Sequence, residues 1–270
     1  MVRKPTSKAK TRADDTEDEA QTISLAKFLS QKAVYKQAAY WIIGNSPLIC
    51  HSWAEKAKLE MLQKQVKAIK AGKAARDPDQ EFADSLYMMT LKDGTEVYGF
   101  PATAIKKCVL SPAHKDKGIP RDTVMRSLWI NAPFVRVRTA FSGAICDLPL
   151  VRLWGSAPEM REDMVRIGAG MKKTANLAYR AQFRVWAIRV VLRYNASVIT
   201  DEVIATLSTD SGLSCGVGDW RNEKGGMFGS FHLATADEEA AWMKFARGKG
   251  PLPEPSYSDD ADIDWLQAAE

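Results

Sequence analysis

A glycine-rich stretch, residues 216–229, gathers the residue types that could bind a phosphate chain. Glycine permits positive φ and lets backbone N–H groups approach a ligand closely, and successive N–H groups can form a concave anion site. Cationic side chains add charge, and an indole ring offers a surface on which a base can stack. We therefore predict that this loop grips a nucleic-acid backbone. The predicted contacts are the amides of Gly216, Gly218, Gly225, Gly226 and Gly229 and the side chains of Trp220, Arg221, Lys224 and Phe228.

Two phosphate-binding loops of other kinds are excluded for this stretch. In a dinucleotide-binding fold the glycines follow a strand and open a helix, whereas residues 216–229 follow a predicted helix and precede a predicted strand. A P-loop needs Gly-Lys followed by Ser or Thr, and the chain has no such sequence. A long hairpin loop without a ligand remains the alternative, because glycine-rich patterns often occur without one.

The segment before the loop predicts a strand and a helix. Apolar and polar residues alternate over 185–194, as in a strand with one buried face, and Arg189 and Arg193 fall on the other face. Thr200 can cap a helix that ends near Gly212, and a short strand follows the glycine-rich loop. A strand, a helix and a strand in about fifty residues suggest half of a ferredoxin-like repeat.

A second strand, over 134–141, carries the same pattern, with Arg136 and Arg138 opposite its apolar positions. Two such strands predict a sheet with helices on one face and arginines on the other. Four-stranded RNA-binding domains hold their ligand on a face of this kind. An antiparallel sheet whose polar face meets only solvent gives the same pattern, so both interpretations stay open.

Residues 148–183 interleave cations with aromatic and methionine side chains. Gly168 and Gly170 argue against a helix through the middle, and we predict an irregular, thumb-like excursion from the sheet. Single-strand binders use cations for phosphates and rings for bases, although these rings could equally belong to the core. The cations that we predict to contact nucleic acid here are Arg166, Lys172, Lys173, Arg180 and Arg184.

The first half of the chain predicts a strand over 38–43 and a basic amphipathic helix over 52–72 that opens with a capping box. The basic face of this helix either meets solvent or lies against a phosphate chain or a neighbouring subunit. An Asp-Gly turn predicts a hairpin over 86–100, and Pro101 suits the first turn of a further helix. The predicted nucleic-acid contacts on that helix are Lys106 and Lys107.

Charge is distributed unevenly along the chain. Six of the 33 acidic residues and none of the 38 basic ones lie in 254–270, so residues 1–253 carry a formal charge of +11. A basic body suits a polyanionic partner, although solubility alone could explain it. Residues 1–22 have few apolar side chains, which predicts disorder. Asp259–Leu266 follows a proline-rich linker and alternates acids with apolar residues, as expected of an interaction segment.

Cysteine and histidine spacing does not indicate a metal site. The four cysteines include no C-x-x-C pair, which favours free thiols in an intracellular protein, and the three histidines show no ligand spacing. We predict no metal, no cofactor and no catalytic set. A ribonuclease that relies on one histidine is the alternative, with His51 as its candidate. No apolar run suits a signal peptide or a membrane span, so we expect a soluble, cytoplasmic protein.

Two segments together resemble one family. Gly99–Leu110, a proline-started helix with small residues and lysines, and Gly216–Leu233, the glycine-rich loop with its following strand, are similar to the corresponding parts of the RAMP superfamily. These are ferredoxin-like RNA-binding proteins that form the backbone of CRISPR effector complexes. The resemblance implies an α+β fold with a ferredoxin-like (RRM-like) βαββαβ core. The predicted domain covers 23–248, with insertions at about 52–95 and 142–183, a disordered tail over 1–22, and a linker with an acidic tail over 249–270.

The resemblance also implies cooperative, sequence-independent binding to a single strand by stacked protomers. Its backbone contacts would be Lys106, Lys107, Trp220, Arg221 and Lys224. The acidic tail departs from the family and is more like that of single-stranded DNA-binding proteins. We therefore favour a phage protein that coats single-stranded DNA as a homo-oligomer or filament, with a tail that recruits a replication or recombination protein. A CRISPR-type RNA-binding subunit, a nuclease of the same fold and a phage structural protein are the alternatives.

Overall fold

The computed structural model describes residues 34–52, 77–111, 118–138, 145–167 and 174–255. The predicted tails, nearly all of the predicted helix over 52–72, and the cations Lys172 and Lys173 lie outside these ranges. In chain order the elements are β1 (Tyr35–Gly44), β2 (Leu48–Cys50), α3 (Pro78–Ser85), β3 (Met88–Thr90), β4 (Glu96–Pro101), α4 (Ala102–Val109), α6 (Arg121–Ser127), β5 (Leu128–Ile130), β6 (Phe134–Arg138), β7 (Ile145–Gly155), β8 (Glu159–Ile167), β9 (Thr174–Phe183), β10 (Trp186–Asn195), α7 (Asp201–Ser214), the 3₁₀ turn η3 (Asn222–Lys224), β11 (Phe231–Leu233) and α8 (Ala236–Ala246).

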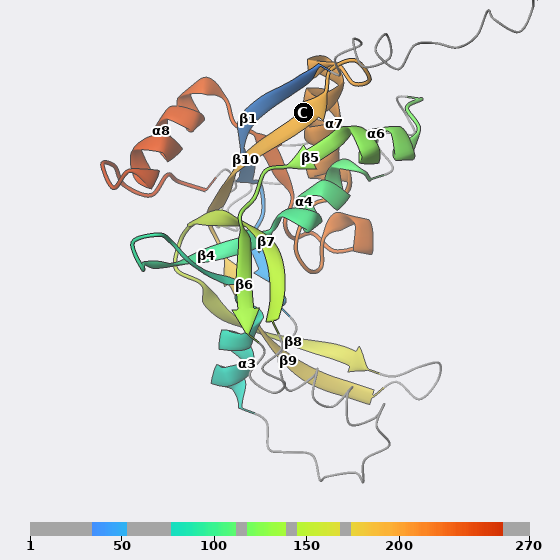
Figure 1. Cartoon of the computed structure of the whole chain (residues 1–270). Helices are drawn as coiled ribbons and strands as arrows, with labels where there is room; N and C mark the ends of the chain where they lie inside the picture. The colour runs from blue at the N-terminus through green and yellow to red at the C-terminus, as the bar shows by residue number, and fades with distance from the viewer. Residues whose placement is uncertain (1–33, 53–76, 112–117, 139–144, 168–173, 256–270) are drawn as a thin grey trace, which may run out of the picture. The chain divides into compact units, whose positions relative to one another are not determined.

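The protein has a mixed α+β fold built on antiparallel strands (Figure 1). The larger sheet has eight described strands, six of them in the order β11-β1-β10-β7-β4-β3, with β5 paired to β10 and β6 paired to β7. Strands β1 and β10 pair over most of their length, with Tyr40 opposite Val190. The predicted α+β class is confirmed.

Strand β10 forms where the sequence predicts it, because its side chains alternate between two environments. Arg189 and Arg193 are exposed on one face. Burial of large apolar side chains on the other face stabilises the fold by about 1.5–3 kcal/mol each. The residues on that face, all 2% exposed or less, are Trp186, Ile188, Val190, Leu192 and Tyr194.

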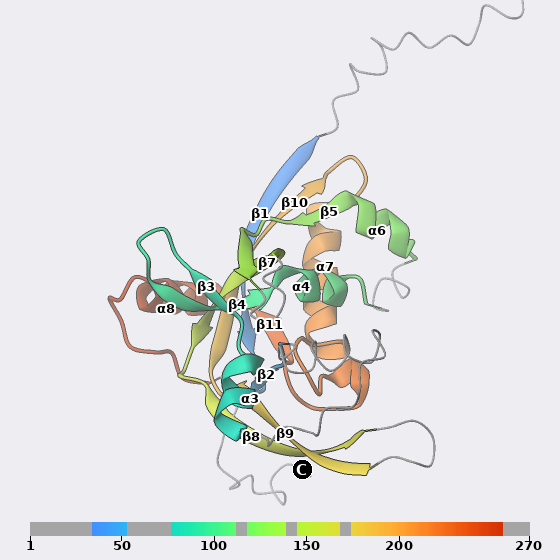
Figure 2. The same ribbon diagram turned by 60° about the horizontal axis from the view of Figure 1, so that its bottom comes forward.

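Helices lie on both faces of the larger sheet (Figures 1 and 2). Helices α4 and α7 cover the face that carries Ile188, and Ile105 and Leu207 of these helices belong to the same buried cluster. Helix α8 lies on the opposite side of β1 and β10. The sheet therefore has two covered faces over part of its length, and this departs from the predicted sheet with one open face.

An aromatic cluster attaches α8 to the sheet. The ring of Trp41 on β1 stacks on the ring of Trp242 of α8, and the ring centroids are 6.3 Å apart. The ring centroids of Trp154 on β7 and Phe245 on α8 are 6.4 Å apart. The helix begins with a capping box, in which Thr235 and Glu238 exchange hydrogen bonds. Local capping starts this helix, and the buried indole rings hold it in place.

A smaller sheet in the order β2-β9-β8 contains the long β8–β9 hairpin. Helix α3 packs against β9, and Ser85 Oγ accepts a hydrogen bond from Ala181 N at 2.8 Å. The prediction of an irregular excursion over 148–183 is therefore wrong, because the described part forms regular strands. In β8 the buried Asp163 is paired with arginines, and an internal polar position of this kind obscures the alternation on which strand prediction depends.

The hairpin between β3 and β4 was predicted from the sequence, whereas helix α6 was not. The predicted Asp-Gly hairpin is confirmed, since Met88 pairs with Tyr98 across a turn in which Gly94 has φ of +85°. Helix α6 was not predicted, although Pro120 stands directly before its first residue, a position at which proline suits a helix start.

Candidate nucleic-acid interface

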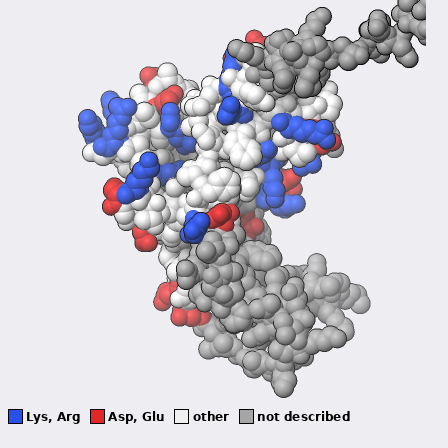
Figure 3. Space-filling model, in the orientation of Figure 1, with Lys and Arg blue, Asp and Glu red and all other residues white. Residues whose placement is uncertain are grey.

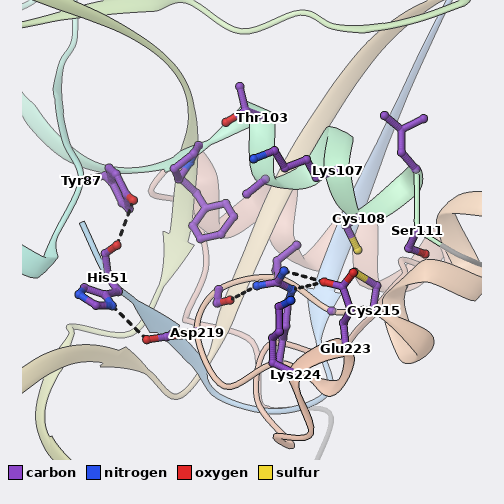
Figure 4. Close-up of a pocket in the computed structure, with 18 of the residues that line it drawn as sticks. His51, Tyr87, Thr103, Lys107, Cys108, Ser111, Cys215, Asp219, Glu223 and Lys224 are labelled. Carbon is purple, nitrogen blue, oxygen red and sulfur yellow. Dashed lines mark hydrogen bonds and ion pairs between the residues drawn. The ribbon is translucent and has the colours of Figure 1, made fainter. Parts of the chain in front are cut away.

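A pocket of about 690 Å³ lies between α4, the end of β2 and the glycine-rich loop (Figure 4). Residues of both Gly99–Leu110 and Gly216–Leu233 line it. Thr103 and Lys107 come from α4, and Gly218 and Lys224 come from the loop. His51 and Asp219 lie at one end of the pocket. The fold thus brings two segments that are distant in sequence to one concave surface.

Glycine is required in the loop where its backbone turns or touches a neighbour. Gly218 has φ of +81°, and a Cβ there would lie 2.6 Å from the carbonyl oxygen of Ile49. At Gly226 a Cβ would lie 1.7 Å from the carbonyl oxygen of Trp220. Neither position can hold a side chain unless the backbone shifts. The packing of the loop therefore accounts for these glycines without any ligand.

Four of the five predicted glycine amides donate hydrogen bonds inside the protein, which corrects their assignment as phosphate donors. Buried N–H groups need an acceptor, and a tight loop finds one in its own carbonyl groups. Gly218 lines the pocket and has no such acceptor among the described residues. The amides of Gly216, Gly225, Gly226 and Gly229 donate to the carbonyl oxygens of Ser211, Asn222, Arg221 and Pro47 at 2.9–3.1 Å.

Arg221 braces the loop from within. Its guanidinium donates to the carbonyl oxygen of Gly218 at 3.2 Å and to Glu223 Oε2 at 2.6 Å. Hydrogen bonding to Arg221 holds the pKa of Glu223 below its ordinary value. The predicted charge of Arg221 is therefore largely balanced inside the loop, and its role in this structure is to hold the loop's shape.

Three other cations line the pocket, namely Lys107, Arg121 and Lys224. None of the three forms an ion pair within the described part of the chain. Figure 3 shows Lys and Arg side chains gathered over α4 and α6. Lysine and arginine that are not neutralised by nearby acids attract phosphate groups. Arg121 was missed in the sequence because the segment around it was not predicted to be helical.

A chain of charged contacts ties the loop to the smaller sheet. Asp219 Oδ2 lies 3.1 Å from His51 Nδ1 and 3.4 Å from Arg180 Nε. The hydrogen bond with His51 is the main reason that the pKa of Asp219 lies below its ordinary value, against the opposing effect of burial. Tyr87 also lines this end of the pocket, and burial raises its pKa to about 12.

Arg180 is 7% exposed, which corrects its assignment as a nucleic-acid contact. Its guanidinium lies 3.5 Å from Asp163 and 3.4 Å from Asp219, and these are charge contacts without good hydrogen-bond geometry. Removing a guanidinium from water is costly unless carboxylates surround it. Sequence alone could not distinguish it from a surface arginine, because the acids that surround it are far from it in sequence.

Comparisons with known proteins find likeness among solved structures. No family model matches the chain, and no curated protein matches it. Among solved structures, the crystal structure of Cmr6 from Pyrococcus furiosus is similar at 10% identity. The match covers 74% of this chain and 99% of that chain, with a TM-score of 0.35. At this score the likeness carries no argument about function.

Three other predicted contacts, Lys106, Arg136 and Arg184, lie outside the pocket lining. Lys106 Nζ lies 5.7 Å from the ring centroid of Trp129. Arg136 pairs with Asp147 at 3.7 Å, and Arg184 donates to Glu159 at 3.0 Å. The side chains of Arg138 and Arg166 are not among those described.

The two predicted aromatic contacts of the loop differ in exposure. Trp220 is 42% exposed. Its backbone φ is +53°, a conformation that residues other than glycine rarely adopt. The ring of Phe228 lies under the guanidinium of Arg161, at 4.6 Å. Trp220 is therefore the loop ring that is better placed for a base.

The arginine-bearing sheet face is only partly open, which corrects the prediction of a continuous binding face. Helix α8 covers Trp41 and Ala187 on this face. Arg189, which the strand register places opposite Trp41, and Arg193, four residues further along β10, both stay exposed. A sheet reader of RNA uses its central strands as a platform, and here α8 occupies part of that platform.

Neither metal binding nor a membrane span is indicated by the described residues. No group of three or more His, Cys, Asp or Glu side chains within them lies close enough to hold a metal ion. Among the helices that the structure describes, none combines the length and apolar character needed to cross a membrane.

Proposed function

We propose that the chain binds a single strand of nucleic acid in the pocket between α4 and the glycine-rich loop. The observation that carries the proposal is the convergence of Lys107, Arg121 and Lys224 on this pocket without ion-pair partners in the described part of the chain. Trp220, in the same loop, offers an exposed ring for a base. Binding of this kind reads no sequence, since phosphates and ring faces are common to all strands.

We further propose that the core is ferredoxin-like and remotely related to the RAMP superfamily. In chain order β1, α4, β7, β10, α7 and β11 give strand-helix-strand-strand-helix-strand. The four strands lie side by side in the order fourth, first, third, second, which is the arrangement of two interlocked split βαβ units. The remaining strands and helices would be insertions. A phage protein that coats DNA as an oligomer is the specific form that we favour.

Fluorescence anisotropy with labelled oligo(dT) and oligo(U) at two salt concentrations tests the proposal. Lys107→Ala with Lys224→Ala should weaken binding at least tenfold and lower the salt slope by about 1.4, since each phosphate contact to a single strand contributes about 0.7. Lys92→Ala with Lys249→Ala removes the same charge from exposed positions outside the pocket lining. The proposal would be contradicted if the two double variants lost the same amount of affinity, or if the native chain did not bind either oligonucleotide at low salt.

The DNA and RNA probes separate two forms of the same function. Preference for oligo(dT) supports a DNA-coating protein, and preference for oligo(U) supports a CRISPR-type RNA-binding subunit. We propose binding without cleavage, in which His51 anchors the loop through Asp219. Labelled strands incubated with and without magnesium should stay intact. Cleavage that His51→Ala abolishes would instead establish a nuclease.

A further inference from the structure

Part of the α8-facing side of the larger sheet is not covered by any of the residues that the structure describes. The open patch is centred on Arg193 of β10, which the strand register places directly opposite Trp129 of β5. The guanidinium of Arg193 also lies 5.1 Å from the ring centroid of Tyr35. The two rings are 56% and 59% exposed. We define the open patch as Tyr35, Trp129, Arg189 and Arg193.

The arginines of the open patch have no acidic partner among the residues that the structure describes. Neither Arg189 nor Arg193 forms an ion pair with a carboxylate of the described residues. Exposed tryptophan, tyrosine and arginine side chains grouped together are typical of the central residues of binding surfaces. The chemistry of the patch suits a ligand that presents carboxylates together with apolar or aromatic side chains.

The chain itself carries such a segment close by. After α8, Leu252 packs into the aromatic cluster around Trp41, on the same side of the sheet as the open patch. The last described residue is Pro255. The following residues, 256–270, contain five acids, no lysine or arginine, and the apolar side chains Ile263, Trp265 and Leu266. Charge and apolar character both complement the open patch.

The distances allow this contact within one molecule. From Trp41 to Tyr35 the strand advances six residues, or about 20 Å at 3.3 Å per residue. Residues 256–270 can span up to about 50 Å when extended. Tethering also gives the segment an effective concentration in the millimolar range, so even a weak contact would be populated.

We propose that Asp259–Leu266 docks on the open patch of its own chain. Its aspartates pair with Arg189 and Arg193, and its apolar side chains cover the rings of Tyr35 and Trp129. The docked segment contacts the open patch, beside the part of the sheet face that α8 covers. The proposal does not depend on the proposed function, because it requires no nucleic acid.

Hydroxyl-radical footprinting of the full chain, read by mass spectrometry, tests the contact. Replacing Asp259, Asp260, Asp262 and Asp264 together by Asn should raise the oxidation rates of Tyr35 and Trp129 at least about threefold, if two-thirds or more of the molecules are docked. Trp220 and Met227, which belong to the glycine-rich loop and are exposed, should keep their rates. Unchanged rates at Tyr35 and Trp129 would overturn the proposal.

Charge reversal provides a second readout. Arg189→Glu with Arg193→Glu should release the segment in the same way. Adding Asp260→Lys, Asp262→Lys and Asp264→Lys to that variant should restore protection of Trp129, and failure to restore it would overturn the pairing. Protection in the native chain should not change on tenfold dilution. Loss of protection on dilution would mean that the segment docks on a second molecule, contrary to the proposal.

Discussion

The carboxylate of Asp219 lies 3.1 Å from Nδ1 of His51 and so joins the glycine-rich loop to the residue that follows β2. The backbone supports the same junction, since Asp219 N donates to the carbonyl oxygen of Ile49 at 3.0 Å. These two bonds hold one wall of the pocket against the smaller sheet. The shape of the pocket therefore depends on a charged contact that can be titrated.

Asp219→Asn should lower the free energy of unfolding by about 1 kcal/mol at neutral pH, since it replaces a hydrogen bond to a charged carboxylate by a weaker one to a neutral amide. The hydrogen bond with His51 lowers the pKa of Asp219 in the folded protein, so folding favours the ionised form. This contribution is present above the ordinary carboxyl pKa of about 3.9 and is lost as the pH falls through the lower folded pKa. Denaturant unfolding at several pH values should show the difference between the native chain and the variant narrowing below about pH 4.

Asp122→Asn is the control for this titration, because Asp122 is exposed at the start of α6. Its effect on stability should be small at every pH. If the difference in unfolding free energy between the native chain and Asp219→Asn stays constant down to pH 2, ionisation of Asp219 does not contribute to stability.

Two adjacent glycines of the loop should respond differently to alanine. At Gly226 a Cβ would meet the carbonyl oxygen of Trp220 at 1.7 Å, so Gly226→Ala forces the backbone apart. Gly225 has φ of +77° with nothing within 4 Å of a Cβ, so Gly225→Ala should cost only about 1–2 kcal/mol, the strain of a left-handed residue. Urea unfolding should show a larger loss of unfolding free energy for Gly226→Ala than for Gly225→Ala. Equal losses would mean that the loop is not packed as described.

Substitution of Trp220 should weaken binding to a single strand and leave the stability of the fold nearly unchanged. Trp220→Gly relieves a positive φ, which offsets the lost packing of a ring that is 42% exposed, so the unfolding free energy should change by less than about 1 kcal/mol. Affinity for a single strand should fall by about 1–3 kcal/mol for each base that stacks on the ring. Trp220→Phe keeps a ring and should retain most of the affinity. Unchanged binding by Trp220→Gly would remove Trp220 from the interface.

Thiol reactivity should report on occupation of the pocket. Interaction with the neighbouring Cys108 thiol lowers the pKa of Cys215, and both residues line the pocket. Burial raises the pKa of Cys50 to about 12. Because the thiolate is the reactive form, iodoacetamide at pH 8 should modify Cys215 before Cys50, and a bound oligonucleotide should slow that reaction. Mass spectrometry of the digested protein measures both rates, and equal rates at the two sites would contradict the described environments.

Part of the candidate site was predictable from local sequence. Lys107, Arg221 and Lys224 were named from composition and resemblance, and all three line the pocket. Asp219 and Arg121, which also line it, were not named. An acid in a cationic loop has no local signature of a structural role, and the importance of Asp219 appears only when His51 is beside it.

The sequence by itself determined the elements whose cause is local. Alternation over 186–195 produced β10, a capping box started α8, and an Asp-Gly turn produced the hairpin between β3 and β4, because each depends only on neighbouring residues. Only the tertiary structure decided that Arg180 is buried between Asp163 and Asp219, and that α8 covers part of the arginine-bearing sheet face. Charge and periodicity do not specify which distant segments come into contact in the fold. Those tertiary contacts decide whether a cation is paired with acids inside the protein or remains available to a partner.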